Sequence, residues 1–141
     1  MTLRPARVED AAACAAIVRG WLDGLDWMPQ DGPSAEILTG IIAEGIPQRE
    51  FWVIGDPVRG YLSFKEDENL IAGLYTSQPG SGAGKALVDR VKEGRDFLQL
   101  WTHEPNRAAQ RFYHREGFQT VERSAEGRGE GVPELRMEWH A

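Results

Sequence analysis

The glycine-rich segment at residues 77–85, Ser-Gln-Pro-Gly-Ser-Gly-Ala-Gly-Lys, restricts the possible folds more than any other stretch of this chain. The apolar run at 70–76 before it predicts a strand, and Leu87, Val88 and Val91 after it share one face of a helix. Glycines let a backbone approach a ligand closely, and the first amides of a helix present free N–H groups and the positive end of its dipole. This order of elements predicts a site for an anion such as a phosphate, with a ligand-free connection as the alternative.

Two well-known phosphate-binding loops do not fit these residues. A nucleotide-binding P-loop would need its first glycine at Pro79 and a metal-binding hydroxyl at Ala86. A dinucleotide fingerprint needs glycine or alanine at its sixth position, whereas the sixth residue counted from Gly80 or from Gly82 is a lysine or a leucine. The pattern that is present is G-x-G-x-G directly before a helix.

Size and composition indicate one domain that spans residues 1–141, of which 41% are hydrophobic and 27% charged. No run of about 18 apolar residues could span a membrane, and Glu9 and Asp10 lie where a signal peptide would be apolar. We therefore expect a cytoplasmic protein with no membrane partner. One cysteine and three scattered histidines match no metal-site spacing. We expect no metal, and interpret Cys14 as a small buried hydrophobic residue rather than a reactive thiol.

The charge is unevenly distributed along the chain. Residues 1–70 hold six Lys and Arg against twelve Asp and Glu, and residues 71–141 hold ten of each, so the whole net charge of −6 belongs to the first half. Binding to nucleic-acid phosphates depends on clustered Lys and Arg. We therefore expect no nucleic-acid partner.

The remaining sequence alternates helical and strand patterns. Ser34 is a candidate N-cap for a helix that ends at Gly45 and Pro47, and the Gly- and Pro-containing residues 55–60 read as a hairpin turn. The expected elements are a strand at 1–6, helices from 8 to 22 and from 34 to 45, strands at 51–54, 61–64 and 70–76, a helix around 87–91, a strand at 97–102, a helix at 106–116, and strands at 118–122 and 134–139.

Four bulky side chains and one loop have no assigned role at this stage. Trp21, Trp27, Met28 and Trp52 fit a pocket wall and the core equally well. Residues 124–133 are polar and rich in glycine, which predicts a mobile surface loop.

A second motif lies about twenty residues after the glycine loop. Residues 106–118 contain Asn, then Ala109 three positions on, then Phe112 and Tyr113, and end in Gly-Phe. Ala109, Phe112 and Tyr113 lie on adjoining positions of one helical face. Alone, such a stripe is more typical of a core. Together with the glycine loop it favours a cofactor site.

The two motifs together resemble the signatures of the GNAT (Gcn5-related N-acetyltransferase) family. The family's N-x-x-A-x-x-F/L-Y-x-x-x-G-F is matched in full at residues 106–118, and R/Q-x-x-G-x-G/A is matched at Gly82 and Gly84, with Pro79 where the family has Arg or Gln. The expected order of elements is also the family's. The resemblance implies an α/β (α+β) fold: a mixed, mostly antiparallel sheet of about six to seven strands, splayed between the fourth and fifth and flanked by about four helices.

The resemblance also implies an activity, in which a primary amine attacks acetyl-CoA directly in a ternary complex. Main-chain groups of the fourth strand would pair with the pantetheine arm, the glycine loop would hold the pyrophosphate, Asn106 would bind the pantetheine, and Arg115 an outer phosphate. Tyr113 would be the general acid that protonates the leaving thiolate, and Gly73 would mark the bulge at the splay. The implied cofactor-binding residues are Leu74, Tyr75, Thr76, Gly80, Ser81, Gly82, Ala83, Gly84, Lys85, Asn106, Ala109, Phe112 and Arg115.

Several alternatives stay open. The general base could be one of the acids Glu66, Asp67 and Glu68 before the fourth strand, or His103 or Glu104 after the fifth, all of which are expected near the splay; a water chain would serve equally well. A non-catalytic acyl-CoA-binding module is suggested by Pro79, although such a module would have no need of Tyr113. A toxin-like enzyme that acetylates aminoacyl-tRNA is disfavoured by the acidic first half. We expect that half to shape the acceptor site and the acceptor amine to be cationic; a homodimer, common in the family, is possible.

Overall fold

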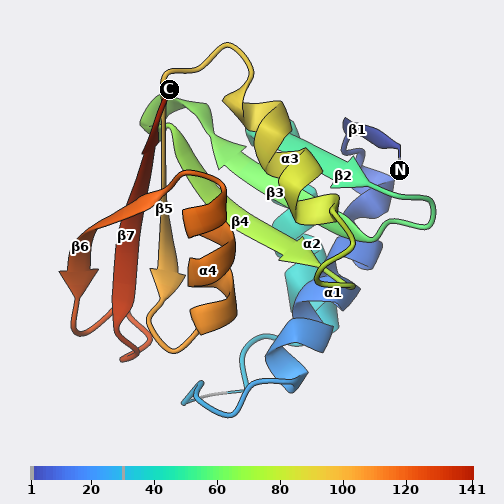
Figure 1. Ribbon diagram of the computed structural model, residues 1–141. Helices are drawn as coiled ribbons and strands as arrows, with labels where there is room; N and C mark the ends of the chain where they lie inside the picture. Colours follow the sequence, from blue (N-terminus) through green and yellow to red (C-terminus); the bar gives the residue numbers. More distant parts are fainter. Residues whose placement is uncertain (1, 30) are drawn as a thin grey trace.

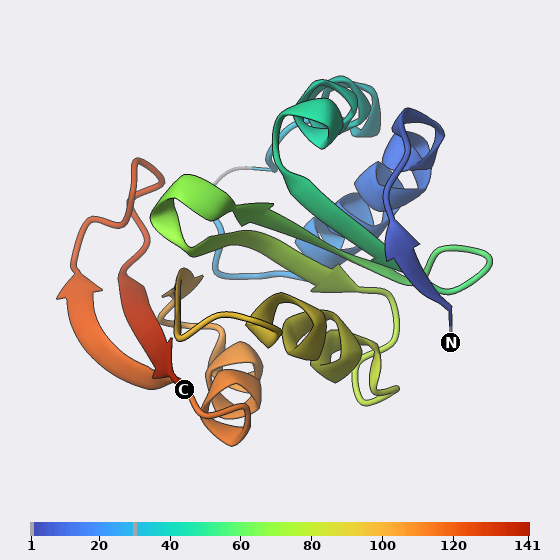
Figure 2. The same cartoon turned by 90° about the horizontal axis from the view of Figure 1, so that it is seen from above.

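Seven strands form one mixed sheet in this computed structural model, which describes residues 2–29 and 31–141. The strand order is β1-β2-β3-β4-β5-β7-β6. Helices α1 and α2 cover one face of the sheet, and α3 and α4 cover the other (Figures 1 and 2). The elements are β1 Leu3–Pro5, α1 Ala11–Asp23, α2 Ala35–Gly45, β2 Glu50–Ile54, β3 Gly60–Lys65, β4 Leu70–Thr76, α3 Ala83–Lys92, β5 Phe97–His103, α4 Arg107–Arg115, β6 Gln119–Ser124 and β7 Glu134–His140, with 3-10 turns at Val8–Asp10, Ile46–Gln48 and Glu66–Glu68.

The expected element order and sheet are confirmed. Neighbouring strands are antiparallel except β4 and β5, which are parallel and paired only at Leu70 with Gln99 and at Ile71 with Leu100. Beyond that point β4 shifts its register against β3, so that Ala72 is an extra residue directly before Gly73. A bulge bends and twists its strand. The two parallel strands therefore separate after Ile71, which is the expected splay.

Each face of the sheet has its own core. Leu87, Val88 and Val91 of α3 pack with Tyr113 of α4 on one face, as the helical spacing predicts. The α1 and α2 face contains Cys14, which is fully buried, and burial raises the pKa of its thiol to about 12. Cys14 is thus a packing residue, as expected. No helix in the described ranges has the length and apolar character needed to cross a membrane.

The expected N-cap of α2 is confirmed as well. The Ser34 hydroxyl accepts a hydrogen bond from the Ile37 N–H at 3.2 Å. The chain entering α1 is fixed differently, by Asp10, whose carboxylate accepts two hydrogen bonds of 2.8 Å from the Arg4 guanidinium and one of 2.8 Å from the Arg7 N–H. These contacts tie β1 to the start of α1.

We expect Asp10→Asn to lower the free energy of unfolding by about 1–2 kcal/mol at pH 7, because the charge-assisted contacts with Arg4 are lost. The Arg4 hydrogen bonds lower the pKa of Asp10 in the folded protein. Its stabilisation is therefore complete above the unfolded pKa of about 3.9 and is lost as the pH falls through the folded value. In urea denaturation, the difference in the free energy of unfolding between wild type and variant should become smaller as the pH is lowered from 7 to 3. A difference independent of pH, or equally large in Glu9→Gln, would contradict this role.

Candidate active site

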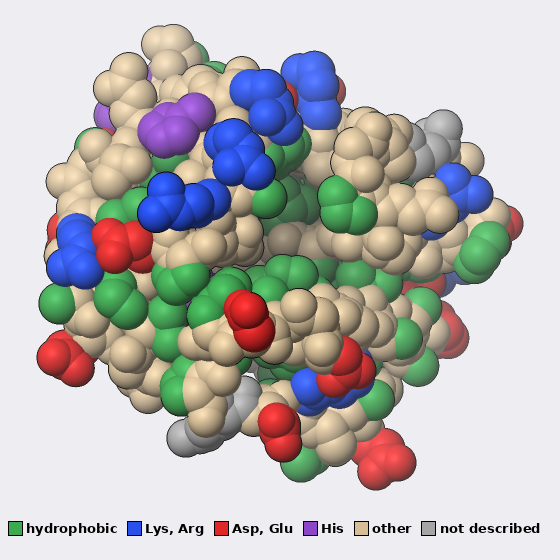
Figure 3. Space-filling view, turned by 60° about the horizontal axis from the view of Figure 1, so that its bottom comes forward, with side chains coloured by type: hydrophobic (Ala, Val, Ile, Leu, Met, Phe, Trp, Pro, Cys, Tyr) green, Lys and Arg blue, Asp and Glu red, His purple; other side chains and the backbone are tan. Residues whose placement is uncertain are grey.

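A cavity of about 590 Å³ opens where β4 and β5 separate. Figure 3 shows this hollow, with a row of Lys and Arg side chains along one side of it. Its wall includes the end of β4, the glycine loop, the end of β5, one face of α4 and Trp21 of α1. The predicted site residues that line it are Leu74, Tyr75, Thr76, Gly80, Ser81, Gly82, Gly84, Lys85, Asn106, Ala109, Phe112, Tyr113 and Arg115. The exception is Ala83, which is 1% exposed and packs in the core.

The glycine loop forms an anion cradle at the start of α3. Gly80 and Gly82 adopt φ values of +83° and +88°, which residues with a Cβ rarely adopt. The Ala83 N–H donates to the Ser81 hydroxyl at 3.4 Å. In the described part of the chain no acceptor is recorded for the N–H groups of Gly84 and Lys85. These two donors and the helix dipole are available to an anion.

Gly84 has a second role, since it lets α4 approach α3. A Cβ added at Gly84 would lie 3.2 Å from Cζ of Phe112.

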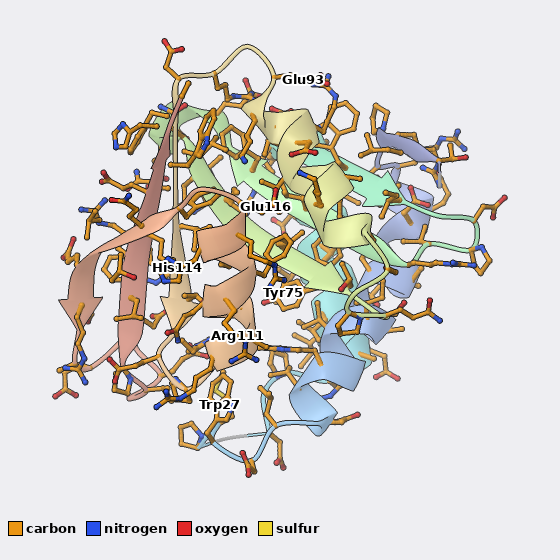
Figure 4. All side chains as sticks on the ribbon, viewed as in Figure 1. Trp27, Tyr75, Glu93, Arg111, His114 and Glu116 are labelled. Carbon is orange, nitrogen blue, oxygen red and sulfur yellow. The ribbon has the colours of Figure 1, made fainter. Side chains whose placement is uncertain are left out.

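The charges around the loop also favour an anion, because Lys85, Arg111 and Arg115 line the cavity there against one carboxylate, Glu116. Figure 4 shows Arg111 on α4 and Glu116 directly after the end of that helix. Lys85 is already partly neutralised, as its ammonium lies 3.3 Å from Asp89 and 3.4 Å from Glu116.

Tyr113 lies on the α4 wall with its ring in the core. Phe112 and Phe118 contact it edge-on, with ring centroids 5.2 and 5.6 Å away. Burial raises the pKa of Tyr113, so the phenol is protonated at neutral pH. No hydrogen bond is recorded for its hydroxyl within the described ranges.

At the start of α4, the Asn106 side-chain oxygen caps the helix by accepting a hydrogen bond from the Ala109 N–H at 3.1 Å. The side-chain NH2 group of Asn106 is therefore left for a ligand.

Aromatic side chains close the other end of the cavity. The Trp21 ring lies 5.3 Å from the Tyr75 ring and 6.3 Å from His103, so it bridges the mouth between β4 and β5. The Trp27 ring lies 6.1 Å from the Trp21 ring and 5.1 Å from the His103 ring. Figure 4 shows Trp27 below the end of α4. Trp21 is thus a pocket wall and Trp27 its support. Trp52 instead packs against the core, with the Arg90 guanidinium 4.2 Å from its ring.

The β6–β7 loop is anchored at this end, contrary to the mobile surface loop predicted for residues 124–133. The Arg128 guanidinium binds the Glu134 carboxylate at 3.1–3.2 Å and lies 5.4 Å from the Trp101 ring. Glu130 accepts a hydrogen bond of 2.7 Å from His103. Val132 is buried. Sequence reasoning missed Arg128, Glu130 and Glu134 as parts of the site, because polar side chains in and beside a glycine-rich stretch read as solvent-exposed, whereas it had named His103 as a candidate base.

His103, Glu130 and Glu134 place ligand atoms within 4.8 Å of one another, a grouping that the sequence did not suggest. Arg128 already binds Glu134, and His103 already binds Glu130. Hydrogen bonds between protein groups therefore account for this cluster without a metal ion.

No family model and no curated protein matches the sequence, whereas solved structures match over its full length. YjaB of Escherichia coli, in its apo form, aligns with TM-score 0.78 at 21% identity, over 98% of this chain and 96% of that one. The ribosomal-protein-alanine N-acetyltransferase of Brucella melitensis aligns with TM-score 0.77 at 16% identity, over 100% of both. A GNAT superfamily phosphinothricin acetyltransferase of Sinorhizobium meliloti, in complex with AcCoA, aligns with TM-score 0.75 at 18% identity, over 99% of this chain and 87% of that one. This chain has the GNAT fold.

Within the GNAT fold of this chain, the expectation that Glu66, Asp67 and Glu68 lie near the splay is wrong. Gln99 donates from its backbone to Asn69 O at 2.9 Å and from its side chain to Glu68 O at 2.8 Å. The turn that carries these acids therefore lies at the closed end, where β4 and β5 are still paired. Sequence order places it before β4, but only the parallel register shows which end of the strands is open.

Two further expectations need revision. Glu104 does not line the cavity, because its carboxylate forms a surface pair with Arg123 at 2.7 and 3.1 Å that lowers the pKa of Glu104. The acidic first half was expected to shape the acceptor site, but none of its carboxylates lines the cavity among the described residues. Among the described residues, the carboxylates that line the cavity are Glu116 and Glu134, both from the second half. Of the predicted base candidates, His103 alone lines the cavity.

Proposed function

We propose that this protein belongs to the GNAT family and is an acetyl-CoA-dependent N-acetyltransferase that transfers acetyl to a primary amine. The single observation that carries the proposal is the meeting of an anion cradle, a splayed strand and a buried tyrosine in one cavity. A protein that only bound acyl-CoA would need the first two features but not the third.

The residues of β4 support binding of the pantetheine arm. Leu74, Tyr75 and Thr76 pair with β3 on one side, but their other edge faces the opening beyond the last β4–β5 pair. Free backbone groups at a strand edge can pair with an extended ligand. A main-chain N–H at this edge would also polarise the thioester carbonyl, as an oxyanion hole does. The Gly84 and Lys85 amides at the start of α3 would hold the pyrophosphate.

Acetyl-CoA supplies the activated acyl group as a thioester. Attack by the amine nitrogen forms the C–N bond and breaks the C–S bond, and the thiolate that leaves must receive a proton. We assign that proton to the Tyr113 hydroxyl, because the phenol is protonated at neutral pH and faces the cavity. Direct attack needs no acyl-enzyme, and the buried Cys14 lies in the core of the opposite face.

We further propose that the acceptor is cationic before it loses its proton. At the acceptor end of the cavity, near the β6–β7 loop, Glu134 and the Arg128 guanidinium line the wall, and a second carboxylate, Glu130, lies behind the wall, bonded to His103. Trp21 and Tyr75 add aromatic faces, which attract an ammonium group. The proposal of a cationic acceptor thus rests on the carboxylates and aromatic rings at this end of the cavity and not on the acidic first half of the sequence.

Basic acceptors should accordingly be preferred. We expect polyamines or lysine-containing peptides to have kcat/KM at least about tenfold above acidic amino acids, and this advantage to shrink as the salt concentration rises. Competition between the two classes in one assay, followed by mass spectrometry of the acetylated products, measures the ratio. Preferential acetylation of acidic amino acids would contradict a cationic acceptor.

The activity itself is tested by amine-dependent release of free thiol from acetyl-CoA. We expect acetyl-CoA to raise the melting temperature of the protein, and the addition of an acceptor amine to release one CoA for each N-acetyl product. Thermal stabilisation without amine-dependent thiol release across a broad amine panel would instead identify a binding module.

A further inference from the structure

His103 and Glu130 form a hydrogen-bonded pair at the acceptor end of the cavity, and the transfer chemistry proposed above gives this pair no role in moving a proton. Their side-chain atoms Nε2 and Oε1 are 2.7 Å apart, and the His103 side chain is 16% exposed. His103 is the last residue of β5 and lines the cavity.

The parallel register places His103 level with the strand edge that would hold the thioester. Ile71 pairs with Leu100, and Ala72 is the extra residue of the bulge, so three ladder steps further along the two strands are Tyr75 and His103. The strands separate after this pair, so the two positions face each other across the opening. A side chain at 103 is therefore placed beside the acceptor amine rather than beside the CoA phosphates.

Glu130 determines which imidazole nitrogen is basic. A carboxylate accepts hydrogen bonds and cannot donate them, so Nε2 of His103 carries the hydrogen. The remaining nitrogen, Nδ1, then has the free lone pair, and no hydrogen bond to it is recorded in the described part of the chain. A carboxylate that orients a histidine in this way also stabilises the imidazolium that forms when the ring accepts a proton.

The surroundings hold the ring in place. Trp27 and Trp21 pack against it, and the His103 carbonyl accepts hydrogen bonds from the Asn106 N–H at 3.0 Å and from the Gln110 side chain at 3.3 Å. Glu130 and Glu134 each place a carboxylate oxygen within 4.8 Å of a ring nitrogen, and Glu134 is paired with Arg128. One carboxylate is thus left to balance a charged imidazole.

We infer that His103 is the general base of the acetyl transfer and that Glu130 positions it; this inference rests on the proposed function. Nδ1 takes one proton from the acceptor ammonium, the freed amine attacks the carbonyl carbon, and the C–S bond breaks. The thiolate takes its proton from Tyr113. The second proton that the nitrogen loses in becoming an amide returns to the Tyr113 oxygen, and His103 releases its proton to solvent. The sum is ammonium plus acetyl-CoA giving amide, CoA thiol and one proton.

The test compares His103→Ala, His103→Gln, Glu130→Gln and Glu130→Asp with wild type. The matched control is His140→Gln, because His140 also pairs with a glutamate, Glu138 at 3.1 Å, but on the exposed end of β7 outside the cavity lining. For each protein we would measure the melting temperature, the Kd for acetyl-CoA, and kcat and KM for one acceptor amine.

We expect both His103 variants to lower kcat about 10²- to 10³-fold, the size typical of a lost general base, with the Kd for acetyl-CoA within twofold of wild type. Added imidazole should restore part of the activity of His103→Ala. Glu130→Gln should lower kcat about tenfold, Glu130→Asp should lie between it and wild type, and His140→Gln should match wild type. The Gln variant keeps the assay informative if the Ala variant folds poorly.

Two results would overturn this inference. If wild type acetylates amines and both His103 variants keep kcat within threefold, His103 is not the base. A rise in KM for the amine at unchanged kcat would make it a binding residue instead. The proposed function fails separately, when wild type binds acetyl-CoA but releases no thiol with any amine, and the inference then falls with it.

Discussion

Replacement of Tyr113 by phenylalanine is expected to lower kcat about 10²- to 10⁴-fold while the Kd for acetyl-CoA stays within twofold of wild type. The hydroxyl is the group we assign to protonation of the leaving thiolate. The ring, which packs between Phe112 and Phe118, is kept in the variant. The fold and the cavity wall should therefore be preserved, and the loss should appear in turnover alone. Thiol release at saturating acetyl-CoA and amine, with calorimetry for the Kd, separates these quantities.

Tyr61→Phe is the matched control for this substitution. Tyr61 is also a buried tyrosine whose pKa is raised by burial, but it belongs to the α1 and α2 core and does not line the cavity. Its variant should keep the wild-type kcat. Unchanged turnover in Tyr113→Phe would remove the proton-donor role, and an equal loss in both variants would show that the effect is structural.

The second large effect is expected at the anion cradle, where Gly82→Ala should weaken binding of acetyl-CoA about 5- to 30-fold. Gly82 is the N-cap of α3 and has φ +88°, a left-handed conformation that costs an L-residue roughly 1–2 kcal/mol. An alanine there favours a different loop path, which would turn the amides that follow away from the phosphate position. The Kd for acetyl-CoA, measured by calorimetry, reports this directly.

Gly94 provides the control at the other end of α3. It has φ +73°, nothing lies within 4 Å of an added Cβ, and it does not line the cavity. Gly94→Ala should thus carry a similar backbone strain without a change in the Kd. If both variants bind acetyl-CoA like wild type, the glycine loop is not the phosphate site. If both variants weaken binding of acetyl-CoA equally, the loss comes from lower stability of the fold and not from a lost contact between the loop and the phosphates.

The sequence was sufficient to predict the parts of the site that are contiguous in the chain. The glycine loop and residues 106–118 each fold as one local unit, and their spacing alone places Gly82, Gly84, Asn106 and Tyr113 on the elements that line the cavity. The local rules of turns, caps and helical faces decide such placements. Ala83 is the exception, since a residue inside a motif can still have its side chain turned into the core.

The acceptor end could not be predicted in the same way, because it depends on strand order. β7 lies between β5 and β6, and this insertion brings the β6–β7 loop with Arg128 and Glu130 against the end of β5. Nothing local in a polar, glycine-rich stretch signals that contact. Trp21 reaches the same end from α1, more than fifty residues earlier in the chain than Tyr75. The acids at 66–68 were misplaced for a related reason, as the β4–β5 register is not visible in the sequence.

The central claim is that the opening between β4 and β5 holds acetyl-CoA with its thioester at Tyr113. A crystal structure of the protein with acetyl-CoA tests it most directly. We predict that the pantetheine arm pairs with the backbone of β4 at residues 74–76, that the pyrophosphate accepts hydrogen bonds from the Gly84 and Lys85 amides, and that the sulfur lies within hydrogen-bond reach of the Tyr113 hydroxyl. Acetyl-CoA bound elsewhere, or bound in this opening with its sulfur directed away from Tyr113, would contradict the account.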